Sequence, residues 1–346
     1  MTKREKKSLY ALHFEELQNI IEACGEKKFR AKQIADDLYK CRYSAIKEFR
    51  LLPASLIASL DSDYCVFDFE LVRAQYSKDK QTSKYLFLTG DRKYVESVLM
   101  QYEYGNTICV SSQIGCRMGC NFCASTVNGL ERNLEAYEML QQIAYIQHIE
   151  QLKISNIVIM GMGEPLDNYD EVIKFIELVN SESVFHISMR KITLSTCGIA
   201  PKIRALADRN MPINLALSLH NPFNHRRREI MPVGARYSVE EVMEAIDYYI
   251  GRTGRRVTME YTMIDGENDG LEEAKELCKL LKGKLIHVNL IALNEIEGGK
   301  KSKSSEANIN FFKNYLSKQG INVTLRKSLG QDIDAACGQL RAVNLV

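Results

Sequence analysis

Short apolar runs alternate with amphipathic stretches from residue 135 to residue 325, and this alternation constrains the fold more than any other feature. The expected strands are Asn156–Met160, Lys191–Ser195, Ile213–Leu217, Arg256–Met263, Leu285–Leu290 and Asn322–Leu325. The expected helices are Glu135–Glu150, Asp170–Asn180, Ala200–Asp208, Val239–Gly251, Leu271–Lys282 and Ser305–Lys318. Strand–helix alternation with buried strands predicts a parallel sheet in an α/β fold.

With one more strand before residue 116, the pattern gives about six or seven parallel strands, fewer than the eight of a closed barrel. We therefore expect a partial, open barrel of the (β/α)6 type. Ligands of such sheets bind at the carboxyl ends of the strands. Functional residues are accordingly expected directly after each strand.

Two further regions precede this core. Residues 1–60 predict short helices at Phe14–Ala23, at Phe29–Tyr43 and from Pro53 to Leu60, with basic residues that indicate either a solvated face or an RNA-binding module. Residues 61–101 predict a small antiparallel β region, with strands at Phe67–Ala74, Ser83–Leu88 and Tyr94–Gln101. The expected domains are thus 1–60, 61–101, a core at 102–330, and a C-terminal loop and tail at 331–346.

Three cysteines, Cys116, Cys120 and Cys123, form a C-x3-C-x2-C run. Thiolates this close in the chain can bind one soft metal centre. Structural zinc takes four ligands, and an iron–sulfur cluster with four irons is normally held by four cysteines. The next cysteine is Cys197, so three ligands would leave one iron open to a small molecule.

Composition limits the setting and the partners. Ten cysteines without an apolar signal segment favour reduced thiols in a cytoplasmic protein, and no apolar run approaches the roughly 18 residues of a membrane helix. The net charge is only +2, so any basic surface must be local. Candidate phosphate contacts are His225–Arg228, Arg252, Arg255, Arg256, Lys300, Lys301 and Lys303, besides the basic residues of the N-terminal helices.

Small polar residues follow several expected strands. They are Gly163 and Glu164, Ser195, Ser218 and His220, and Asn294. Such residues are commonly turn or cap residues. Their repetition at the strand ends of one sheet, with the cysteine run at its head, favours a cleft for a polar cofactor.

Six blocks of sequence together resemble one family. They are Thr107–Cys116, Phe122–Thr126, Gly129–Leu134, Gly161–Pro165, Leu217–His220 and Asp332–Leu340. In order and spacing they are similar to the RlmN/Cfr family of radical S-adenosylmethionine (SAM) RNA adenine methyltransferases. The resemblance covers essentially the whole chain and implies a partial radical SAM barrel with an N-terminal RNA-binding module.

The resemblance also implies the site. Cys116, Cys120 and Cys123 would hold a [4Fe–4S] cluster, and SAM would bind its open iron. The implied SAM contacts are Gly163, Glu164, Ser195, Ser218, Leu219, His220 and Asn294. The methyl-carrying cysteine falls on Cys337, the resolving cysteine on Cys109 and the base on Glu96. Cys24, Cys41, Cys65, Cys197 and Cys278 are expected to be structural.

The chemistry requires a nucleophile between SAM and the base, because C2 of adenine is electron-poor. A cysteine thiolate can take the methyl group first. Cys337 would be methylated by one SAM, and a second SAM, reduced by the cluster, would yield the radical that removes a hydrogen from that methyl group. Addition to C2 would tie the enzyme to its RNA. A transient Cys109–Cys337 disulfide and proton transfer to Glu96 would release the product.

Alternatives remain open at this point. Pro165 after Glu164 favours the RlmN branch, which methylates C2 in 23S rRNA and in tRNA next to the anticodon. The Cfr branch methylates C8 and gives antibiotic resistance. The stretch His220–His225 departs from the usual RlmN form, and the chain ends six residues after Leu340, so no contact from a longer tail is expected.

Two hypotheses from other classes also remain. A non-catalytic iron–sulfur or zinc RNA-binding protein would need a fourth protein ligand, and a tRNA thiomethylating enzyme would usually need a second cysteine triad. The expected partners are 23S rRNA, tRNA and an electron donor such as flavodoxin or ferredoxin. We expect a monomer and no membrane contact.

Overall fold

A computed structural model describes residues 6–296 and 298–341, so the first five residues, residue 297 and the predicted tail beyond 341 lie outside it. Its main sheet has the strand order β14-β13-β12-β11-β10-β9-β6-β5-β4-β3. The seven strands from β14 to β6 run parallel. They are β6 (Gly105–Cys109), β9 (Ile154–Ile159), β10 (Ile192–Thr196), β11 (Asn214–Ser218), β12 (Val257–Met263), β13 (Ile286–Ala292) and β14 (Val323–Arg326). The expected α/β fold is confirmed, and its sheet is open because β14 and β3 are both edge strands.

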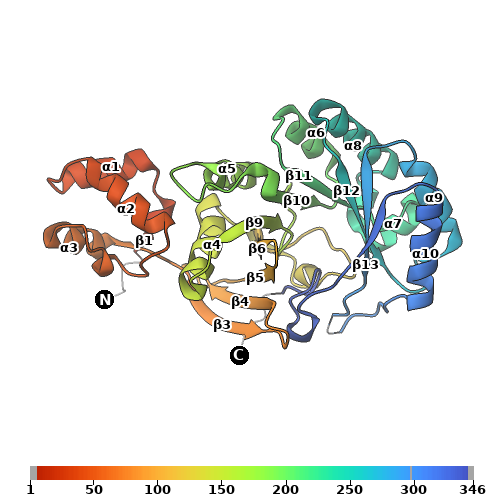
Figure 1. Cartoon of the computed structure of the whole chain (residues 1–346), viewed down its shortest axis with the longest axis horizontal. Coiled ribbons are helices and arrows are strands. Elements are labelled where there is room, and N and C mark those ends of the chain that lie inside the picture. Colours follow the sequence, from red (N-terminus) through yellow and green to blue (C-terminus); the bar gives the residue numbers. More distant parts are fainter. Residues whose placement is uncertain (1–5, 297, 342–346) are drawn as a thin grey trace.

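Helices connect the parallel strands and cover the outer face of the sheet (Figure 1). They are α4 (Ala136–Glu150), α5 (Tyr169–Asn180), α6 (Ala200–Asp208), α8 (Val239–Thr253), α9 (Leu271–Leu281) and α10 (Glu306–Lys318). Each begins and ends within two residues of the expected helix, because its apolar face is buried against the strands. The sequence reading missed the short helix α7 (Asn224–Ile230) and the pair β7 (Gln113–Gly115) and β8 (Leu130–Asn133).

The strands expected as a separate β region belong to the main sheet. β3 (Glu70–Tyr76), β4 (Thr82–Leu88) and β5 (Tyr94–Tyr102) continue it in antiparallel orientation, and β5 pairs with β6. Residues 70–102 therefore share a backbone ladder with the parallel core. The pattern of residues predicted that these segments are strands, but it did not predict that β5 would pair with β6.

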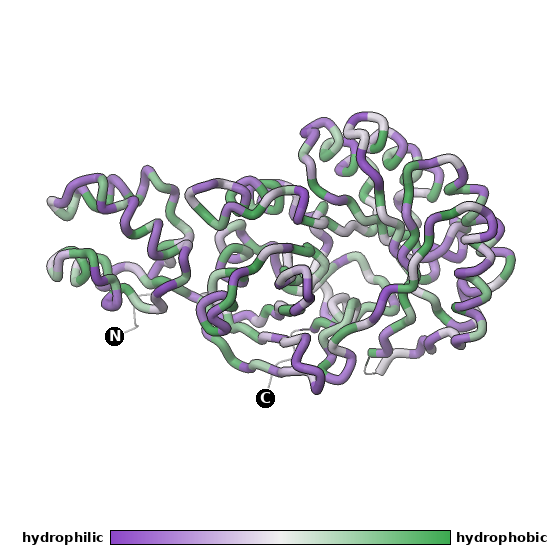
Figure 2. Tube along the Cα trace, viewed as in Figure 1, coloured by the Kyte–Doolittle hydropathy of each residue, from purple (hydrophilic) through white to green (hydrophobic). Residues whose placement is uncertain are grey.

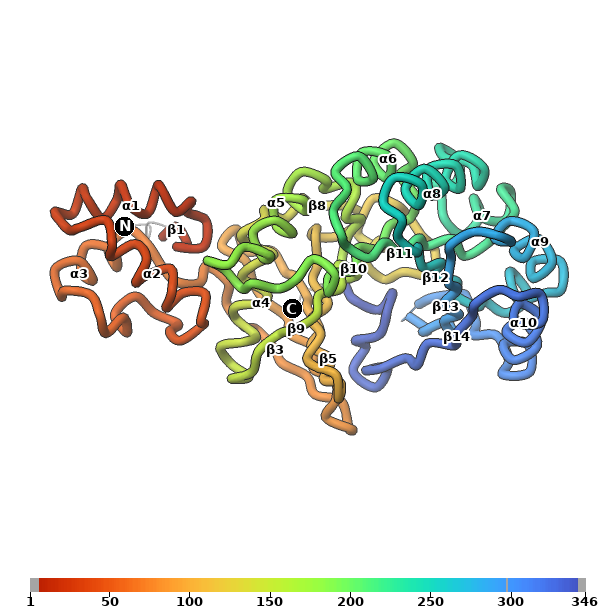
Figure 3. The backbone as a smooth tube through the Cα atoms, turned by 45° about the horizontal axis from the view of Figure 1, so that its top comes forward, coloured from red at the N-terminus to blue at the C-terminus, as the bar shows by residue number. Residues whose placement is uncertain are grey.

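The N-terminal helices form a unit beside the barrel, as Figures 1 and 3 show from two directions. It contains α1 (Phe14–Ala23), α2 (Phe29–Tyr39) and α3 (Ala54–Asp63), and the short strands β1 (Lys7–Ser8) and β2 (Tyr64–Cys65) pair with each other. Hydrophobic and hydrophilic residues are mixed along these helices (Figure 2), as expected for helices with one buried face. Tyr10 stacks on Phe67 at 5.6 Å, which joins the unit to the barrel.

The segment that follows β14 crosses the open side of the sheet. The backbone N–H of Lys78 donates to the Asp332 carboxylate at 2.9 Å, and Ile333, Ala335 and Leu340 pack on Val98 of β5. Residues at the two ends of the strand order are thereby brought together. Within the described part of the chain, no helix combines the length and the apolar character that crossing a bilayer requires.

Candidate active site

The loop that carries the three clustered cysteines is held in place by its own backbone. β7 pairs with β8 in antiparallel fashion, and the Cys116 N–H donates to the Gly129 carbonyl at 2.9 Å. Gly115 has a φ of +74°, and a Cβ there would overlap the Gly129 oxygen. The hydroxyl of Thr126 donates to the Cys123 carbonyl at 2.9 Å. The loop geometry therefore requires glycine at 115 and a hydroxyl at 126.

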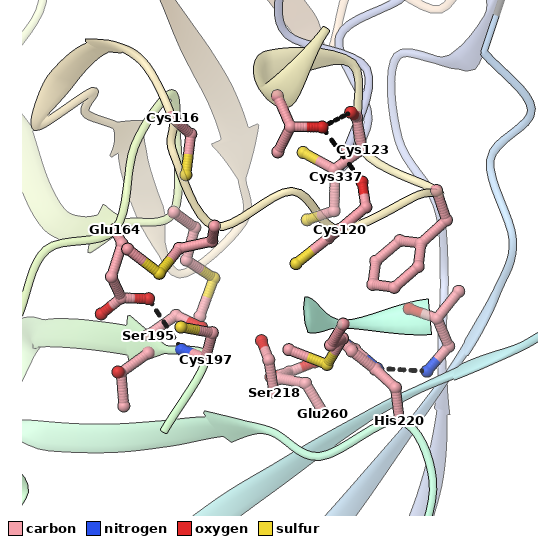
Figure 4. A pocket seen from close by; sticks show the side chains of 18 of the residues that line it. Cys116, Cys120, Cys123, Glu164, Ser195, Cys197, Ser218, His220, Glu260 and Cys337 are labelled. Carbon is pink, nitrogen blue, oxygen red and sulfur yellow. Dashed lines mark hydrogen bonds between the residues drawn. The ribbon is translucent and has the colours of Figure 1, made fainter. Parts of the chain in front are cut away.

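The cysteines line a cavity of about 160 Å³ at the carboxyl ends of the parallel strands. Its wall includes most of the predicted site, namely Cys116, Cys120, Cys123, Gly163, Glu164, Ser195, Ser218, His220, Asn294 and Cys337. In Figure 4 the sulfurs of Cys120, Cys123 and Cys337 lie near the middle of the cavity, while Cys116 approaches from the side of Glu164. Segments more than 200 residues apart in sequence thus meet in one place.

The three thiols fit an iron–sulfur cluster better than a single ion. Among the described residues, no group of three or more His, Cys, Asp or Glu side chains is placed to hold one metal ion. Tetrahedral zinc would need four ligands converging on a point. A [4Fe–4S] cluster offers separate irons as attachment points, which suits three cysteines spread around one cavity. Burial raises the pKa of the Cys116 thiol to about 12, so a metal must displace its proton on binding.

Glu164 joins the ends of two strands. Its carboxylate accepts from the backbone N–H of Cys197 at 2.7 Å and from that of Leu166 at 3.0 Å, and its own N–H donates to the Gln113 side chain at 2.8 Å. Burial raises the pKa of the carboxyl group above its usual range. The side chains of Thr196 and Cys197 also hydrogen-bond to this carboxylate, which lines the cavity.

His220 is neutral and its tautomer follows from one hydrogen bond. The Nδ1 atom accepts from the Thr262 backbone N–H at 3.0 Å, which leaves the proton on Nε2. Burial, reinforced by the nearby Arg227 guanidinium, lowers the pKa of His220 to about 3. The ring packs edge-on against Phe122, with the ring centres 4.9 Å apart. His220 therefore presents a neutral surface and a hydrogen-bond donor at the cavity wall.

The remaining predicted cofactor contacts differ in position. Ser195 is the penultimate residue of β10 and Ser218 the last residue of β11, and both lie at the cavity wall. Gly163 has a φ of +104°, and a Cβ there would come within 2.6 Å of Gln113. Leu219 lies in the main core and does not line the cavity, and its carbonyl accepts from the Arg227 side chain at 3.2 Å.

Contacts from other elements hold the Cys337 segment over the cavity. The side-chain amide of Asn294 donates to the Cys337 carbonyl at 3.1 Å, so this predicted cofactor contact also anchors the cysteine. The N–H of Ala124 donates to the Gly338 carbonyl at 2.7 Å, and the Ser125 hydroxyl donates to the Leu340 carbonyl at 2.6 Å. The Cys337 segment thus rests directly on the loop of the three cysteines.

Cys109 shares a second, smaller cavity of about 40 Å³ with Cys337. It is the last residue of β6 and is buried beside Met100 and Val98. Burial, and then the neighbouring Cys337, raises the pKa of the Cys109 thiol to about 12, and the Arg326 guanidinium opposes this shift. Neither cysteine forms a disulfide in the structure.

Glu96 lies behind the Cys337 segment and lines neither of the two cavities that contain Cys337. Its carboxylate accepts from the Arg341 backbone N–H at 2.7 Å and pairs with the Lys84 ammonium at 3.3 Å. Lys84 also donates to the Asp334 carbonyl at 3.2 Å. Burial raises the pKa of Glu96, with Lys84 opposing it. In this arrangement Glu96 and Lys84 anchor the segment.

Two charged residues of the barrel interior were missed by the sequence reading. Glu260 of β12 accepts from the Asn289 side chain at 3.1 Å, and its other oxygen lies 3.9 Å from Arg326 at the end of β14. Both line the cysteine cavity. Glu260 could have been identified from the sequence, because a charged residue in the middle of a largely apolar strand is unusual.

The candidate phosphate contacts separate into different groups. Arg227 is fully buried and donates to the Cys197 carbonyl at 2.6 Å, so its assignment to a phosphate was wrong. Arg226 is ion-paired with Glu272 and Glu273. Arg252 is ion-paired with Asp208, and Lys301 with Glu267. Arg256 is exposed and forms no ion pair with any described carboxylate. Spacing alone did not distinguish these cases.

Comparison with known proteins gives consistent results. Residues 110–281 match the Radical SAM superfamily. A protein from Lachnoclostridium phytofermentans, named "Probable dual-specificity RNA methyltransferase RlmN", is 51% identical over 97% of this chain and 95% of its own length. One of the same name from Clostridium perfringens is 47% identical over 97% and 96%. The crystal structure of a radical SAM methyltransferase from Sphaerobacter thermophilus superposes with a TM-score of 0.93 at 40% identity, covering 97% of this chain and all of that one.

Proposed function

Because the chain belongs to the RlmN family of radical SAM RNA methyltransferases, we propose that it methylates carbon 2 of an adenine in RNA, carrying the methyl group on Cys337. The observation that carries this proposal is the meeting of Cys337 with Cys116, Cys120 and Cys123 in one cavity. A cysteine far away in sequence would have no reason to lie there if the cluster were purely structural.

Enzymes of this superfamily use a [4Fe–4S] cluster and SAM. Cys116, Cys120 and Cys123 would hold the cluster. When bound, the cluster and SAM supply the methyl group and the one-electron chemistry that activates it. The protein's own contribution is to bind, orient and exclude water.

The cavity wall offers groups for each part of SAM. Glu164 offers a carboxylate for its ammonium group, and Ser195 and Ser218 offer hydroxyls near the ends of adjacent strands. The Nε2 proton of His220 can be donated to an acceptor on the cofactor. Gly163 lets the backbone approach the ligand closely because it carries no side chain.

Cys337 accepts the methyl group, and Cys109 releases the product. After the methyl carbon has bonded to the adenine, the bond between that carbon and the Cys337 sulfur must break. The Cys109 thiol gives up its proton and its sulfur attacks the Cys337 sulfur, which forms a disulfide. The electron pair of the broken C–S bond goes to the transferred carbon, which takes up a proton and becomes the methyl group. The second cavity supports this step, because both cysteines line it.

Glu96 is the proposed acceptor of the proton lost from C2. Its present contacts with Arg341 and Lys84 face the back of the Cys337 segment. Proton transfer to Glu96 therefore requires that this segment move once RNA is bound. The raised pKa of Glu96 suits a group that must take up a proton.

The proposed substrates are an adenine of 23S rRNA and an adenine of tRNA next to the anticodon, and the electron donor is a flavodoxin or ferredoxin. Adenine in a stacked helix hides its C2 edge, so the target must lie in a loop or be flipped out. The separate N-terminal unit is the proposed first contact with folded RNA.

Mass spectrometry tests the proposal. The purified, cluster-loaded enzyme is incubated with 23S rRNA, tRNA, SAM and reductant, and the nucleosides are analysed. We expect 2-methyladenosine, together with S-methylation of Cys337 in the purified protein. Cys337→Ala should produce no methylated RNA, while Cys278→Ala, the matched change on α9, should retain full activity. Finding 8-methyladenosine would assign the Cfr reaction instead, and finding neither nucleoside would refute the enzyme activity.

A further inference from the structure

The amino-terminal end of the barrel, opposite the cysteine cavity, is open and basic. A cavity of about 530 Å³ lies there, between the start of the parallel strands and the turn that joins β5 to β6. Its cations are Arg190, Lys191, Arg326 and Lys327, and no described carboxylate lines it. In a chain whose net charge is only +2, such segregation of charge is informative.

The exposed cations of this opening are not held in ion pairs with the described carboxylates, although Asp79 lies near enough to Lys327 to interact with it electrostatically. Arg190, Lys191 and Lys327 are exposed, and none forms an ion pair with a described Asp or Glu side chain. Arg256 lines the adjoining cavity of about 610 Å³. It is also exposed and forms no ion pair with a described Asp or Glu side chain. Arg226 and Lys301, by contrast, are ion-paired with neighbouring carboxylates.

A pair of tyrosines stands beside these cations. Tyr102 and Tyr104 stack with their ring centres 4.8 Å apart and their planes at 10°. Tyr104 is 72% exposed, the largest value among the exposed large apolar side chains of the described chain. It occupies the tip of a tight β turn, where glycine or a small polar residue is usual. A large aromatic face held open there suits stacking by a base.

The opening adjoins the active site, because some residues line both. Tyr102 lines both this opening and the small cavity that contains Cys109 and Cys337. Arg326 lines the opening, the small cavity and the cysteine cavity alike. A strand lying on the opening would therefore have a flipped base directed along the barrel interior toward Cys337.

We propose that the Tyr102–Tyr104 pair and the cations Arg190, Lys191, Arg256 and Lys327 form a docking platform for single-stranded RNA at the amino-terminal end of the barrel. Tyr104 stacks on a base that neighbours the target, and the four cations contact the phosphates. This inference rests on the proposed function, because it assigns the route by which the substrate adenine reaches Cys337.

The route has one physical requirement. The small cavity between the platform and Cys337 has about 40 Å³, room for about three waters and too little for a purine. Leu329, Ala335 and Leu340 of the C-terminal segment form its wall. Entry of the base therefore displaces this segment, which is the same movement that would bring Glu96 toward the substrate.

Direct RNA binding tests the platform independently of catalysis. The full-length, cluster-loaded protein is titrated with a fluorescein-labelled RNA stem-loop that carries an unpaired adenine. We expect Tyr104→Ala to raise Kd about tenfold through loss of one stacking contact. The control Tyr248→Ala removes another exposed tyrosine, on α8, and should leave Kd unchanged.

The charge contribution has its own variant and control. Arg190→Gln with Lys191→Gln should weaken binding and reduce the slope of log Kd against log salt concentration by about 1.4, the value for two phosphate contacts on a single strand. Lys275→Gln with Lys318→Gln removes two exposed charges near α9 and α10 and should leave the slope unchanged. Unchanged Kd and slope in both platform variants would refute the platform.

Other outcomes distinguish this inference from the function on which it rests. If the unsubstituted enzyme methylates RNA while the platform variants bind RNA normally, the platform is refuted and the function stands. If the variants lose RNA affinity as expected but no methylated nucleoside is ever formed, the platform stands and the proposed reaction is refuted. If the variants slow only the reduction of the cluster by an acidic flavodoxin, the surface binds the electron donor and not RNA.

Discussion

The two cysteine-bearing segments of the active site are held in opposite ways. The loop of Cys116, Cys120 and Cys123 is fixed by its own backbone, through the β7–β8 pairing and glycines with positive φ. Between β14 and residue 341, where the described chain ends, the segment of Cys337 contains no strand or α-helix, and side chains from distant elements anchor it. These anchors are Lys84, Glu96, Ser125 and Asn294.

The difference corresponds to the two tasks proposed for these cysteines. Cluster ligands must keep one geometry in every step, and a backbone-defined loop provides this at no cost to other elements. A cysteine that takes a methyl group, joins to RNA and then forms a disulfide must occupy more than one position. Anchoring by a few separate hydrogen bonds permits docking and release, because each bond contributes only about 1 kcal/mol.

The largest expected effect is on RNA methylation, and substitutions of Cys120 and Cys337 should abolish it in different ways. Cys120→Ala should remove the cluster, and with it both SAM cleavage and RNA methylation. Cys337→Ala should retain the iron content and SAM binding but reduce methylation by roughly four orders of magnitude or more. Iron analysis, SAM binding and methylation assays on both variants measure this. Loss of iron in Cys337→Ala would show that the two segments are not separable.

Removing one anchor should release the Cys337 segment. Lys84→Met leaves the buried Glu96 carboxylate without its cation, which is expected to cost about 3 kcal/mol. Hydrogen exchange of the Arg341 amide, which donates to Glu96, should then become much faster. The double variant with Glu96→Gln should recover part of this protection, because no buried charge is left unpaired. Equal exchange in wild type and Lys84→Met would contradict the anchor.

Two glycines of the fixed loop offer a matched test of its rigidity. Gly115 and Gly129 both have positive φ, at +74° and +72°, but only at Gly115 would a Cβ meet another atom. Gly129→Ala should cost about 1 kcal/mol from backbone strain alone. Gly115→Ala should cost about 2 kcal/mol more, since the β7–β8 pairing must also shift. Urea unfolding of the two apoproteins measures the difference, and similar losses would show that the loop can adjust.

The smallest expected effect is a pH dependence of the unfolding free energy caused by His220, which lines the cysteine cavity beside the fixed loop. His220 has a pKa of about 3 in the folded protein, whereas an unfolded histidine titrates near 6.5. Below pH 6.5 the unfolded chain binds the proton and the folded chain does not, so stability falls as pH decreases toward 3. Between pH 6.5 and 5.5 this group should remove about 1 kcal/mol. Urea unfolding of wild type and His220→Gln over this range should show a shallower dependence in the variant.

Local patterns in the sequence predicted most of the secondary structure. The helices and strands of the barrel lie within a few residues of the expected bounds, because burial of one face is visible as periodicity. Most of the predicted site residues line one cavity, because the carboxyl ends of parallel strands meet at one edge of the sheet. The helix α7 was missed because its arginines suggested a solvated surface.

Sequence by itself thus determined the elements, their alternation and the three-cysteine loop, all of which depend on residues close together in the chain. Only the tertiary structure decided that β3–β5 extend the core sheet, that Arg227 is buried, and that Glu96 lies behind the Cys337 segment. It alone also gathered Tyr104, Arg190 and Lys327 at one opening. The physical reason is that burial, pairing and electrostatic environment depend on neighbours in space, which for these residues come from segments far apart along the chain.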